Sequence, residues 1–373
     1  MHNMRRLLFV IPTLSHGGAE KVLVNLVNNL DNSIFDITVQ TLFDGGVNKQ
    51  YLKPHIKTKS VFKKVFPANS YLFALFSPEF LYKRFIKEHY DIIVSYLEGP
   101  TARIVSGCTD ENTKLISWIH CKMDTEKAAS VGFRNFKEAK KCYSVFGYTA
   151  CVSQWVKNWF VDTFDFEKLI GVLYNTIETD EIITKSNEPI DDITLDKDVF
   201  NIISVGKVIA VKAFMRLAHI HKRLLDEGIK NHIYILGVGD EQSKIEKYIA
   251  ENNLTDTFTF LGYNTNPYKY VKECDLYVCS SLSEGFSTSV TESLIVGTPV
   301  VTTLCSGMQE MLGEKDEYGI VTENNEDALY EGVKIMLTTP NMLEEYAQKA
   351  FERGKYFSTA KTTKAVEDML LNL

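Results

Sequence analysis

Two glutamates eight residues apart, Glu284 and Glu292, frame the stretch of this chain whose residue types could do chemistry. Between them, Gly285 would let the backbone approach a ligand closely, and Ser287 and Thr288 offer hydroxyl donors. A helix that begins in this stretch would point N–H groups and a positive dipole end at the ligand, which suits a phosphate. Eight helical residues span about 12 Å, so the carboxylates could hold hydroxyl groups on either side of a diphosphate. Taken alone, such a pair is more often a solvated helix face.

The flanking residues predict the elements that would position this pair. Leu276–Cys279 is an apolar run bounded by serines, which predicts a buried strand. Val290, Leu294 and Ile295 recur at helical spacing, and Gly297-Thr298-Pro299 would end that helix. The sequence therefore predicts a strand, a loop and a helix, with the first glutamate in the loop and the second on the helix.

The rest of the chain alternates apolar runs of strand length with helical patterns. A helix is expected at Ala19–Leu30, and further strands are expected at 7–11, 37–42, 92–96, 115–119, 150–153, 200–205, 232–236, 258–263 and 300–303. This alternation predicts an α/β fold with parallel sheets whose carboxyl edges bind ligand. The polar, acidic stretch Glu178–Asp198 has no sustained periodicity and is interpreted as a linker. A length of 373 residues also favours two domains.

Two other features follow predicted strands in the first half of the chain. Gly17 and Gly18 lie in the loop after the first strand, where a glycine pair is typical of a tight turn. His120 directly follows the strand at 115–119, which places it at the carboxyl edge of a parallel sheet. A lone histidine there is more often structural than catalytic.

The segment from Glu284 to Val301 resembles the E-x7-E signature of the retaining glycosyltransferases of family 4, which have the two-domain GT-B fold. The family usually has EGFxxxxxEAMAxGxPVV, and this chain has EGFSTSVTESLIVGTPVV. The resemblance covers nearly the whole chain, through IPTLSHGGAEKVLVNL, WIHCKM, VLYNTI, VGKVIAVKAF, GVGD, FTFLGY and RGKYFS. It implies two Rossmann-like, doubly wound α/β domains that face a central cleft. Residues 1–180 would bind the acceptor and 181–355 the nucleotide sugar, while 356–373 would form a helix that crosses back to the first domain.

The resemblance also implies roles for individual residues. Lys207 and Lys212 occupy the positions of the cationic pair that grips the donor diphosphate, where positive charge stabilises the departing group. Glu284 would hold hydroxyls of the donor sugar, Glu292 would hold the ribose hydroxyls, and His120 would contact the sugar. The other residues expected at the substrate are Gly17, Gly18, Asn175, Gly206, Gly262, Tyr263, Gly285, Phe286, Ser287 and Thr288.

The implied reaction moves a hexose or N-acetylhexosamine from a nucleotide diphosphate sugar, most simply a UDP-sugar, with retention of configuration. Front-face attack is implied, with a diphosphate oxygen taking the acceptor proton. The acceptor would be a glycan, expected in lipid-linked form, and the reaction would serve the synthesis of a cell-surface polysaccharide. No cofactor and no metal ion are expected, since lysines and a helix N-terminus supply the positive charge.

Three alternatives stay open. A non-catalytic GT-B subunit that supports a partner transferase is motivated by Lys207, Ala213 and Thr176, which differ from the usual family residues. A sugar–nucleotide epimerase could use the same fold, although E-x7-E is specific to the transferases. The two carboxylates could also be a glycoside hydrolase pair, but the expected phosphate cradle between them argues against hydrolysis.

Composition and charge indicate where such a protein would work. The chain is 45% hydrophobic and 24% charged, and no apolar run approaches the roughly 18 residues of a membrane span. Its seven scattered cysteines form no C-x-x-C pair, and the N-terminal apolar run is interrupted too early for a signal peptide. We therefore expect free thiols and a cytoplasmic protein.

Positive charge is concentrated in the first half. Residues 1–180 contain 22 Lys and Arg against 18 Asp and Glu, whereas the remainder contains 19 against 30. Basic residues gather between Lys49 and Lys64, beside the apolar run Tyr71–Phe76. Such a surface suits peripheral binding to an anionic membrane face, and lysines on solvated loops explain it equally well. Nucleic acid is not expected, because the net charge is −7 and no binding motif is present.

Overall fold

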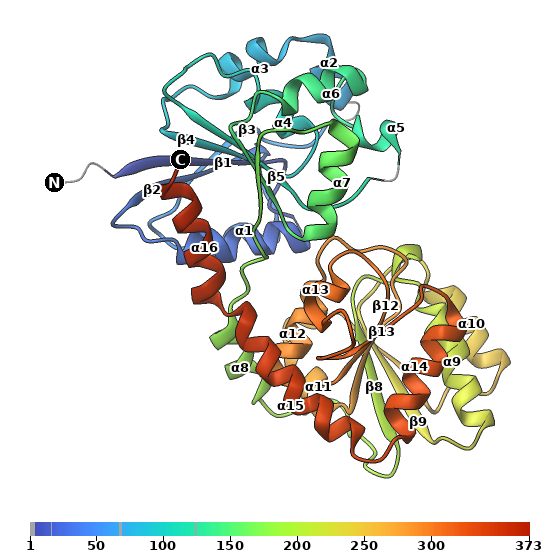
Figure 1. The fold of residues 1–373 in the computed structure, drawn as a ribbon. Coiled ribbons are helices and arrows are strands. Elements are labelled where there is room, and N and C mark those ends of the chain that lie inside the picture. The colour runs from blue at the N-terminus through green and yellow to red at the C-terminus, as the bar shows by residue number, and fades with distance from the viewer. Residues whose placement is uncertain (1–3, 16, 67–68, 124) are drawn as a thin grey trace. The chain divides into compact units, whose positions relative to one another are not determined.

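The chain divides into two compact units, each built on one parallel β-sheet (Figure 1). The computed structural model describes residues 4–15, 17–66, 69–123 and 125–373. Unit 1 comprises Met1–Ile177 and Thr359–Leu373, and unit 2 comprises Glu178–Ser358. These bounds lie three residues from the domain ends expected at 180 and 355. The predicted α/β fold with two Rossmann-like domains is confirmed.

The sheet of unit 1 has the strand order β3-β2-β1-β4-β5-β6-β7, and all its strands are parallel. Its strands are β1 Arg5–Ile11, β2 Phe35–Phe43, β3 Lys57–Phe62, β4 Ile92–Tyr96, β5 Lys114–Ile119, β6 Tyr148–Cys151 and β7 Leu169–Val172. The central strands are apolar and almost fully buried, as parallel strands covered by helices on both faces require. The strands expected in this half are confirmed, whereas the two edge strands β3 and β7 were not predicted.

The helices of unit 1 lie between these strands in the sequence, except for α16, which follows unit 2. They are α1 Gly18–Asn29, α2 Asn69–Leu75, α3 Pro78–Phe85, α4 Pro100–Val105, α5 Glu126–Ala129, α6 Phe136–Tyr143, α7 Gln154–Phe164 and α16 Thr359–Leu371, with the 3₁₀ turn η1 Val47–Tyr51. The C-terminal helix α16 packs on α1, and Arg5 Nη1 donates to the carbonyl of Leu370 at 2.7 Å. The last element of the chain therefore completes unit 1.

Unit 2 has a second parallel sheet, with the order β10-β9-β8-β11-β12-β13. The strands are β8 Phe200–Val205, β9 Asn231–Leu236, β10 Phe258–Gly262, β11 Leu276–Cys279, β12 Val300–Thr303 and β13 Ile320–Thr322. The helices are α8 Thr179–Ser186, α9 Met215–Asp226, α10 Gln242–Glu251, α11 Tyr268–Glu273, α12 Thr288–Val296, α13 Met308–Leu312, α14 Glu326–Thr338 and α15 Met342–Gly354, with the 3₁₀ turns η2 Ala210–Lys212 and η3 Lys355–Phe357. All strands predicted here are confirmed, and the three-residue β13 was missed.

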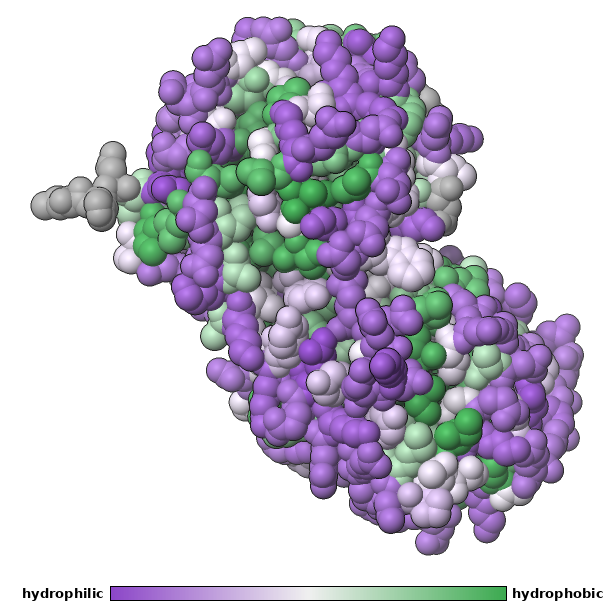
Figure 2. Space-filling view, in the orientation of Figure 1, coloured by the Kyte–Doolittle hydropathy of each residue, from purple (hydrophilic) through white to green (hydrophobic). Residues whose placement is uncertain are grey.

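The interpretation of Glu178–Asp198 as a linker is wrong for its first part. Thr179–Ser186 forms α8, which packs against α11 and α12 and buries Ile182. A single buried isoleucine gives a helix of this length too little periodicity to be recognised. Apolar side chains are concentrated inside each unit, and the face drawn in Figure 2 is largely hydrophilic with smaller hydrophobic groups.

Candidate active site

The strand, loop and helix predicted around the two glutamates are present in unit 2. β11 is fully buried, and α12 begins after Ser287, whose hydroxyl oxygen accepts a hydrogen bond from the N–H of Val290 at 3.4 Å. Gly297 ends the helix at φ 82°, a left-handed conformation that favours glycine. The loop of residues 280–286 therefore lies at the carboxyl edge of the sheet and leads to a helix N-terminus, where backbone N–H groups are available to an anion.

Glu284 is held in this loop by two donors. The Nζ atom of Lys212 and the hydroxyl of Ser281 both donate to Glu284 Oε1, each at 2.6 Å. The side chains of Lys212 and Glu284 are 22% and 12% exposed, so the ion pair is largely removed from water but open on one side. Burial lowers the pKa of Lys212, but the charge and hydrogen bond of Glu284 raise it more, and the net pKa is above the usual 10.5. Lys212 is therefore protonated at neutral pH.

Glycines shape the loop that carries Lys212. A Cβ atom on Gly206 would lie 3.3 Å from Lys212 Cε, and one on Gly237 would lie 1.8 Å from the Gly206 carbonyl oxygen. The loops after β8 and β9 thus touch through their backbones, and a side chain on Gly237 would separate them. Ala213 follows Lys212 at φ 50°, a left-handed position where the resembled family has glycine.

Glu292 lies within α12, whereas Glu284 lies in the loop before this helix. It is half-buried, and the hydroxyl of Tyr268, at the start of α11, lies 3.5 Å from its Oε1. Gly262, the last residue of β10, is at φ 70°, and Tyr263, which follows it in the loop to α11, is 69% exposed. The structure therefore places Glu292 beside the helix that follows Gly262 and Tyr263, two of the residues expected at the substrate.

Three other residues of unit 2 were also expected at the substrate, namely Lys207, Phe286 and Ser287. Lys207 is exposed, and no ion pair to it is found in the described part of the chain. Phe286 is buried against Phe357, with ring centroids 5.7 Å apart, and the Ser287 hydroxyl serves as the helix cap. Phe286 and Ser287 could therefore contact a ligand through their backbones, as could Gly285 and Thr288 beside them.

In unit 1, the expected glycine turn is the N-terminus of α1. Gly17 is the N-cap residue and Gly18 is the first residue of the helix; His16, within the predicted loop, lies outside the described residues. A Cβ atom on Gly17 would lie 1.8 Å from Glu20 Oε2, so only glycine allows the carboxylate of Glu20 to fold back over this turn. Asn175 is buried after β7, and the next residue, Thr176, accepts a hydrogen bond from Asn25 of α1 at 3.2 Å.

His120 follows β5 at the carboxyl edge of the same sheet. Its ring lies 4.6 Å from the ring of Tyr96 and 6.5 Å from that of Trp118. Burial lowers the pKa of His120 to about 3, so the imidazole is neutral at neutral pH. The carboxylate of Glu98 accepts the backbone N–H groups of His120 and Cys121, the second at 2.8 Å. His120 is thus held through its backbone N–H and lies near the rings of Tyr96 and Trp118.

The structure brings the predicted residues together in two groups, one at the carboxyl edge of each sheet. Sequence reasoning missed Ser281 and Tyr268 in unit 2 and Glu98 and Tyr96 in unit 1. Glu98 could have been found, because it follows the predicted strand at 92–96 as His120 follows its own strand. Among the described residues, no three His, Cys, Asp or Glu side chains are grouped to hold a metal ion.

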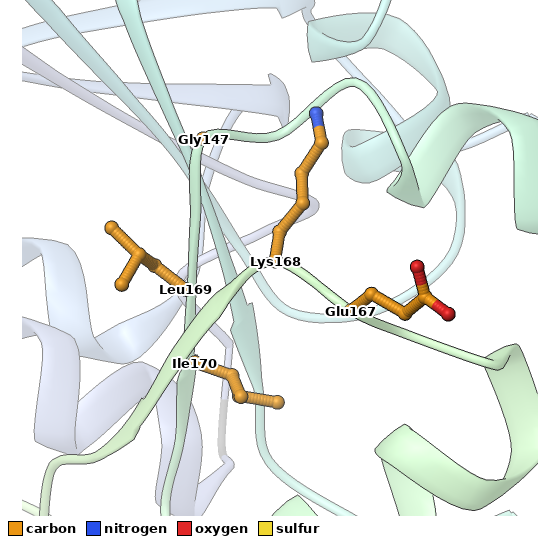
Figure 3. Close-up of a pocket in the computed structure, with 5 residues that line it drawn as sticks. All are labelled: Gly147, Glu167, Lys168, Leu169 and Ile170. Carbon is orange, nitrogen blue, oxygen red and sulfur yellow. The ribbon is translucent and has the colours of Figure 1, made fainter.

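A shallow hollow beside the edge strand β7 contains none of these residues. Figure 3 shows its lining, which comes from the segments before β6 and β7 and from the start of β7. The lining residues are Gly147, Glu167, Lys168, Leu169 and Ile170. One acidic and one basic side chain beside two aliphatic ones define no particular ligand.

Two family models match the chain and together span most of both units. The model described as Glycosyltransferase Family 4 matches residues 16–181, and the one described as Glycosyl transferases group 1 matches residues 186–353. The two parallel-sheet units with loop sites at their carboxyl edges have the GT-B fold. The chain belongs to the family 4 type of GT-B glycosyltransferases, as its E-x7-E segment indicates.

Individual relatives agree with this assignment. The chain is 35% identical over 206 residues to the N-acetylgalactosamine-N,N'-diacetylbacillosaminyl-diphospho-undecaprenol 4-alpha-N-acetylgalactosaminyltransferase of Campylobacter jejuni, over 55% of this chain and 54% of that protein. It is 22% identical over 182 residues to the lipopolysaccharide core biosynthesis glycosyltransferase LpsD of Rhizobium meliloti, over 49% of this chain and 51% of that protein. The matches to these two curated relatives thus span about half the length of each. The crystal structure of Anabaena Alr3699/HepE in complex with UDP has a TM-score of 0.76 and 16% identity, over 99% of this chain and 100% of that chain, which shows the fold alone.

Proposed function

We propose that this chain transfers a hexose or N-acetylhexosamine from a UDP-sugar to a glycan acceptor carried on a lipid, with retention of anomeric configuration. The observation that carries the proposal is the Lys212–Glu284–Ser281 cluster beside the N-terminus of α12. A cation, a carboxylate and a helix end are what a sugar diphosphate requires. The cation and helix end stabilise its phosphates, and the carboxylate accepts hydrogen bonds from its hydroxyls.

In this proposal the residues of unit 2 bind the donor. Lys212, with Lys207, stabilises negative charge as the diphosphate departs, while Glu284 orients the donor sugar and Glu292 holds the ribose. His120 of unit 1 contacts the sugar as a neutral imidazole. A diphosphate oxygen takes the acceptor proton, so no protein base is required. Neither a cofactor nor a metal ion is part of the proposed reaction.

Relatives support the donor and the acceptor class. The Campylobacter jejuni relative is named for transfer of N-acetylgalactosamine to a diphospho-undecaprenol-linked sugar, and the Anabaena structure contains UDP. We extend these two chemistries to this chain as a proposal. A role in the synthesis of a cell-surface polysaccharide follows from the same lipid-linked acceptor.

The test is UDP release with a panel of UDP-hexoses, UDP-N-acetylhexosamines and GDP-mannose, with and without undecaprenyl diphosphate-linked glycans. We expect release that depends on both a UDP-sugar and a lipid-linked acceptor, and a product whose anomeric linkage matches that of the donor. Glu284→Gln in the same assay is the control for transfer by a contaminating enzyme. Binding of nucleotide sugars without turnover on any acceptor would favour the alternative, a non-catalytic subunit.

We also propose that unit 1 binds peripherally to an anionic membrane face, where a lipid-linked acceptor would be found. The structure reduces the number of lysines whose charge is available to a membrane. Lys49, Lys57 and Lys59 are ion-paired with Asp44, Asp36 and Glu88, respectively. Lys63 and Lys64 are exposed beside Val65, and no ion pair to either lysine is found in the described residues. In the described residues, no helix is both long and apolar enough to cross a bilayer.

Liposome co-sedimentation separates the two sets of lysines. Each basic residue near an anionic surface contributes about 1 kcal/mol, so Lys63→Glu/Lys64→Glu should lower the partition coefficient more than tenfold at low salt. Lys57→Glu/Lys59→Glu is the matched control and should have a smaller effect, because its lysines are already neutralised. Wild-type protein that stays in the supernatant with anionic vesicles would refute membrane binding without affecting the proposed transferase activity.

A further inference from the structure

The turn that follows β4 in unit 1 has an unusual backbone. Leu97 is at φ 95°, a left-handed conformation that costs a residue with a side chain about 1–3 kcal/mol. Gly99 follows at φ 82° and ψ −118°, immediately before α4. The hydroxyl of Thr101 donates to the Leu97 carbonyl at 2.9 Å, and the Gly99 N–H donates to the Tyr143 hydroxyl at 3.3 Å. The strained turn is therefore held in place from both sides.

This turn directs the carboxylate of Glu98 to the neighbouring strand. β4 and β5 pair in parallel as far as Tyr96 and Trp118. Beyond these two residues the two segments are no longer paired as strands. Glu98 Oε1 accepts the backbone N–H groups of His120 and Cys121 at this point. Burial raises the pKa of Glu98, although the N–H groups of Cys121 and His120 lower it. A partly buried carboxyl group and a strained turn thus accompany these two backbone hydrogen bonds.

The residue that these bonds fix is the histidine at the carboxyl edge. Its Nε2 is buried, and it has no hydrogen-bond partner in residues 4–15, 17–66, 69–123 and 125–373. The hydroxyl of Tyr96 and the Nε1 of Trp118, whose rings flank the imidazole, are also buried without a partner in these ranges. An imidazole nitrogen without a partner at the carboxyl edge of the sheet is a group that a ligand hydroxyl would satisfy.

We infer that Glu98 is a positioning residue for His120, which holds the imidazole where its Nε2 can receive a sugar hydroxyl. The inference rests on the proposed function, which supplies the sugar. The direction of the histidine side chain depends on the backbone of the loop after β5. Glu98 fixes that loop at its first two residues, His120 and Cys121. Since both N–H groups bond to the same oxygen, a single carbonyl oxygen at this position is sufficient.

The experiment compares Glu98→Ala, Glu98→Gln and Asp91→Ala. Asp91 is the matched control, because its Oδ2 accepts the N–H of Arg6 at 2.7 Å in the same unit, just before β4 begins. The first readout is the ¹H–¹³C signal of the His120 ring, assigned by its loss in His120→Gln. The second is a steady-state measurement of kcat and of KM for the UDP-sugar.

Glu98→Ala should shift and broaden the His120 signal and lower kcat on the order of 10- to 100-fold, because small misplacements of a substrate contact are costly. Its KM for the donor should change less than about threefold, since unit 2 binds the donor diphosphate. Glu98→Gln, with its amide oxygen in the same place, should recover most of both losses. Asp91→Ala should leave the His120 signal and kcat unchanged. If Glu98→Ala does not fold, Glu98→Asp should show the same pattern with a smaller loss.

An unchanged His120 signal in Glu98→Ala would overturn the inference, as would equal loss of activity in Glu98→Ala and Asp91→Ala. A loss in Glu98→Gln as large as in Glu98→Ala would also overturn it, because charge rather than N–H acceptance would then matter. Absence of transfer by the wild-type protein refutes the proposed function instead, and the His120 signal still decides the role of Glu98.

Discussion

Removal of the Lys212 side chain tests the cluster on which the proposed function depends. Breaking a buried ion pair costs about 3–5 kcal/mol, and a hydrogen bond to a charged group contributes about 1.5–3 kcal/mol. The cost should be smaller here, because the Lys212 side chain is 22% exposed and because Ser281 can still donate to Glu284 in the variant. We therefore expect Lys212→Ala to lower the free energy of unfolding by about 2 kcal/mol, measured by urea denaturation. Lys207→Ala, which removes an exposed side chain, should change it by less than about 0.5 kcal/mol.

The same substitution should affect turnover more than donor binding. Negative charge on the diphosphate grows toward the transition state, and loss of one stabilising group there typically lowers kcat about 10²- to 10³-fold. The dissociation constant for UDP, measured by calorimetry, should rise less than about tenfold, because the N-terminus of α12 remains. A Lys212→Ala enzyme with intact kcat and only weaker donor binding would refute the role in leaving-group stabilisation.

The stability difference between wild type and Lys212→Ala should also depend on pH in one direction. The folded-state pKa of Lys212 is raised above 10.5, so its stabilising contribution is fully present below that pH. The contribution is lost as the pH rises through the folded-state value. The difference should therefore be constant from pH 6 to 9 and become smaller above about pH 10.5. A difference that becomes smaller already between pH 7 and 9 would contradict the raised pKa.

Three further predictions follow from single side chains. Glu292→Ala should weaken UDP-sugar binding by roughly 1.5–3 kcal/mol in calorimetry, whereas Glu331→Ala, which removes an exposed carboxylate on α14, should not; equal affinities would exclude the ribose contact. Arg103 is 1% exposed, pairs with Glu138 and donates to two carbonyls at the end of α2, so Arg103→Ala should destabilise the chain by about 3–5 kcal/mol in urea denaturation; a loss below about 1 kcal/mol would contradict this. Ala213→Gly should raise the melting temperature by an amount equivalent to about 1 kcal/mol, because it relieves a left-handed alanine; a lower melting temperature would refute that reasoning.

Much of the fold could be predicted because buried parallel strands are continuous apolar runs. β1, β4, β8 and β12 have this pattern and were found within two residues. The edge strand β3 was missed, because its sequence KTKSVF alternates lysine with smaller residues and is only partly buried. Helix α8 was missed for the related reason that only one side of it is covered by unit 2. Elements with half-exposed surfaces give the weakest periodicity.

The candidate site could be predicted only where a motif fixes the backbone. Glu284 and Lys212 were both expected at the donor, but their direct ion pair depends on the adjacency of β8 and β11, which are separated by two other strands in the sequence. Glu98 and His120 follow strands that are neighbours both in the chain and in the sheet, yet their contact requires the left-handed turn at Leu97. A leucine gives no sign of that conformation, because it rarely adopts it. The strain at Leu97 is therefore visible only in the structure. Substitution of the adjacent Glu98 tests whether this turn positions His120 or only supports the fold.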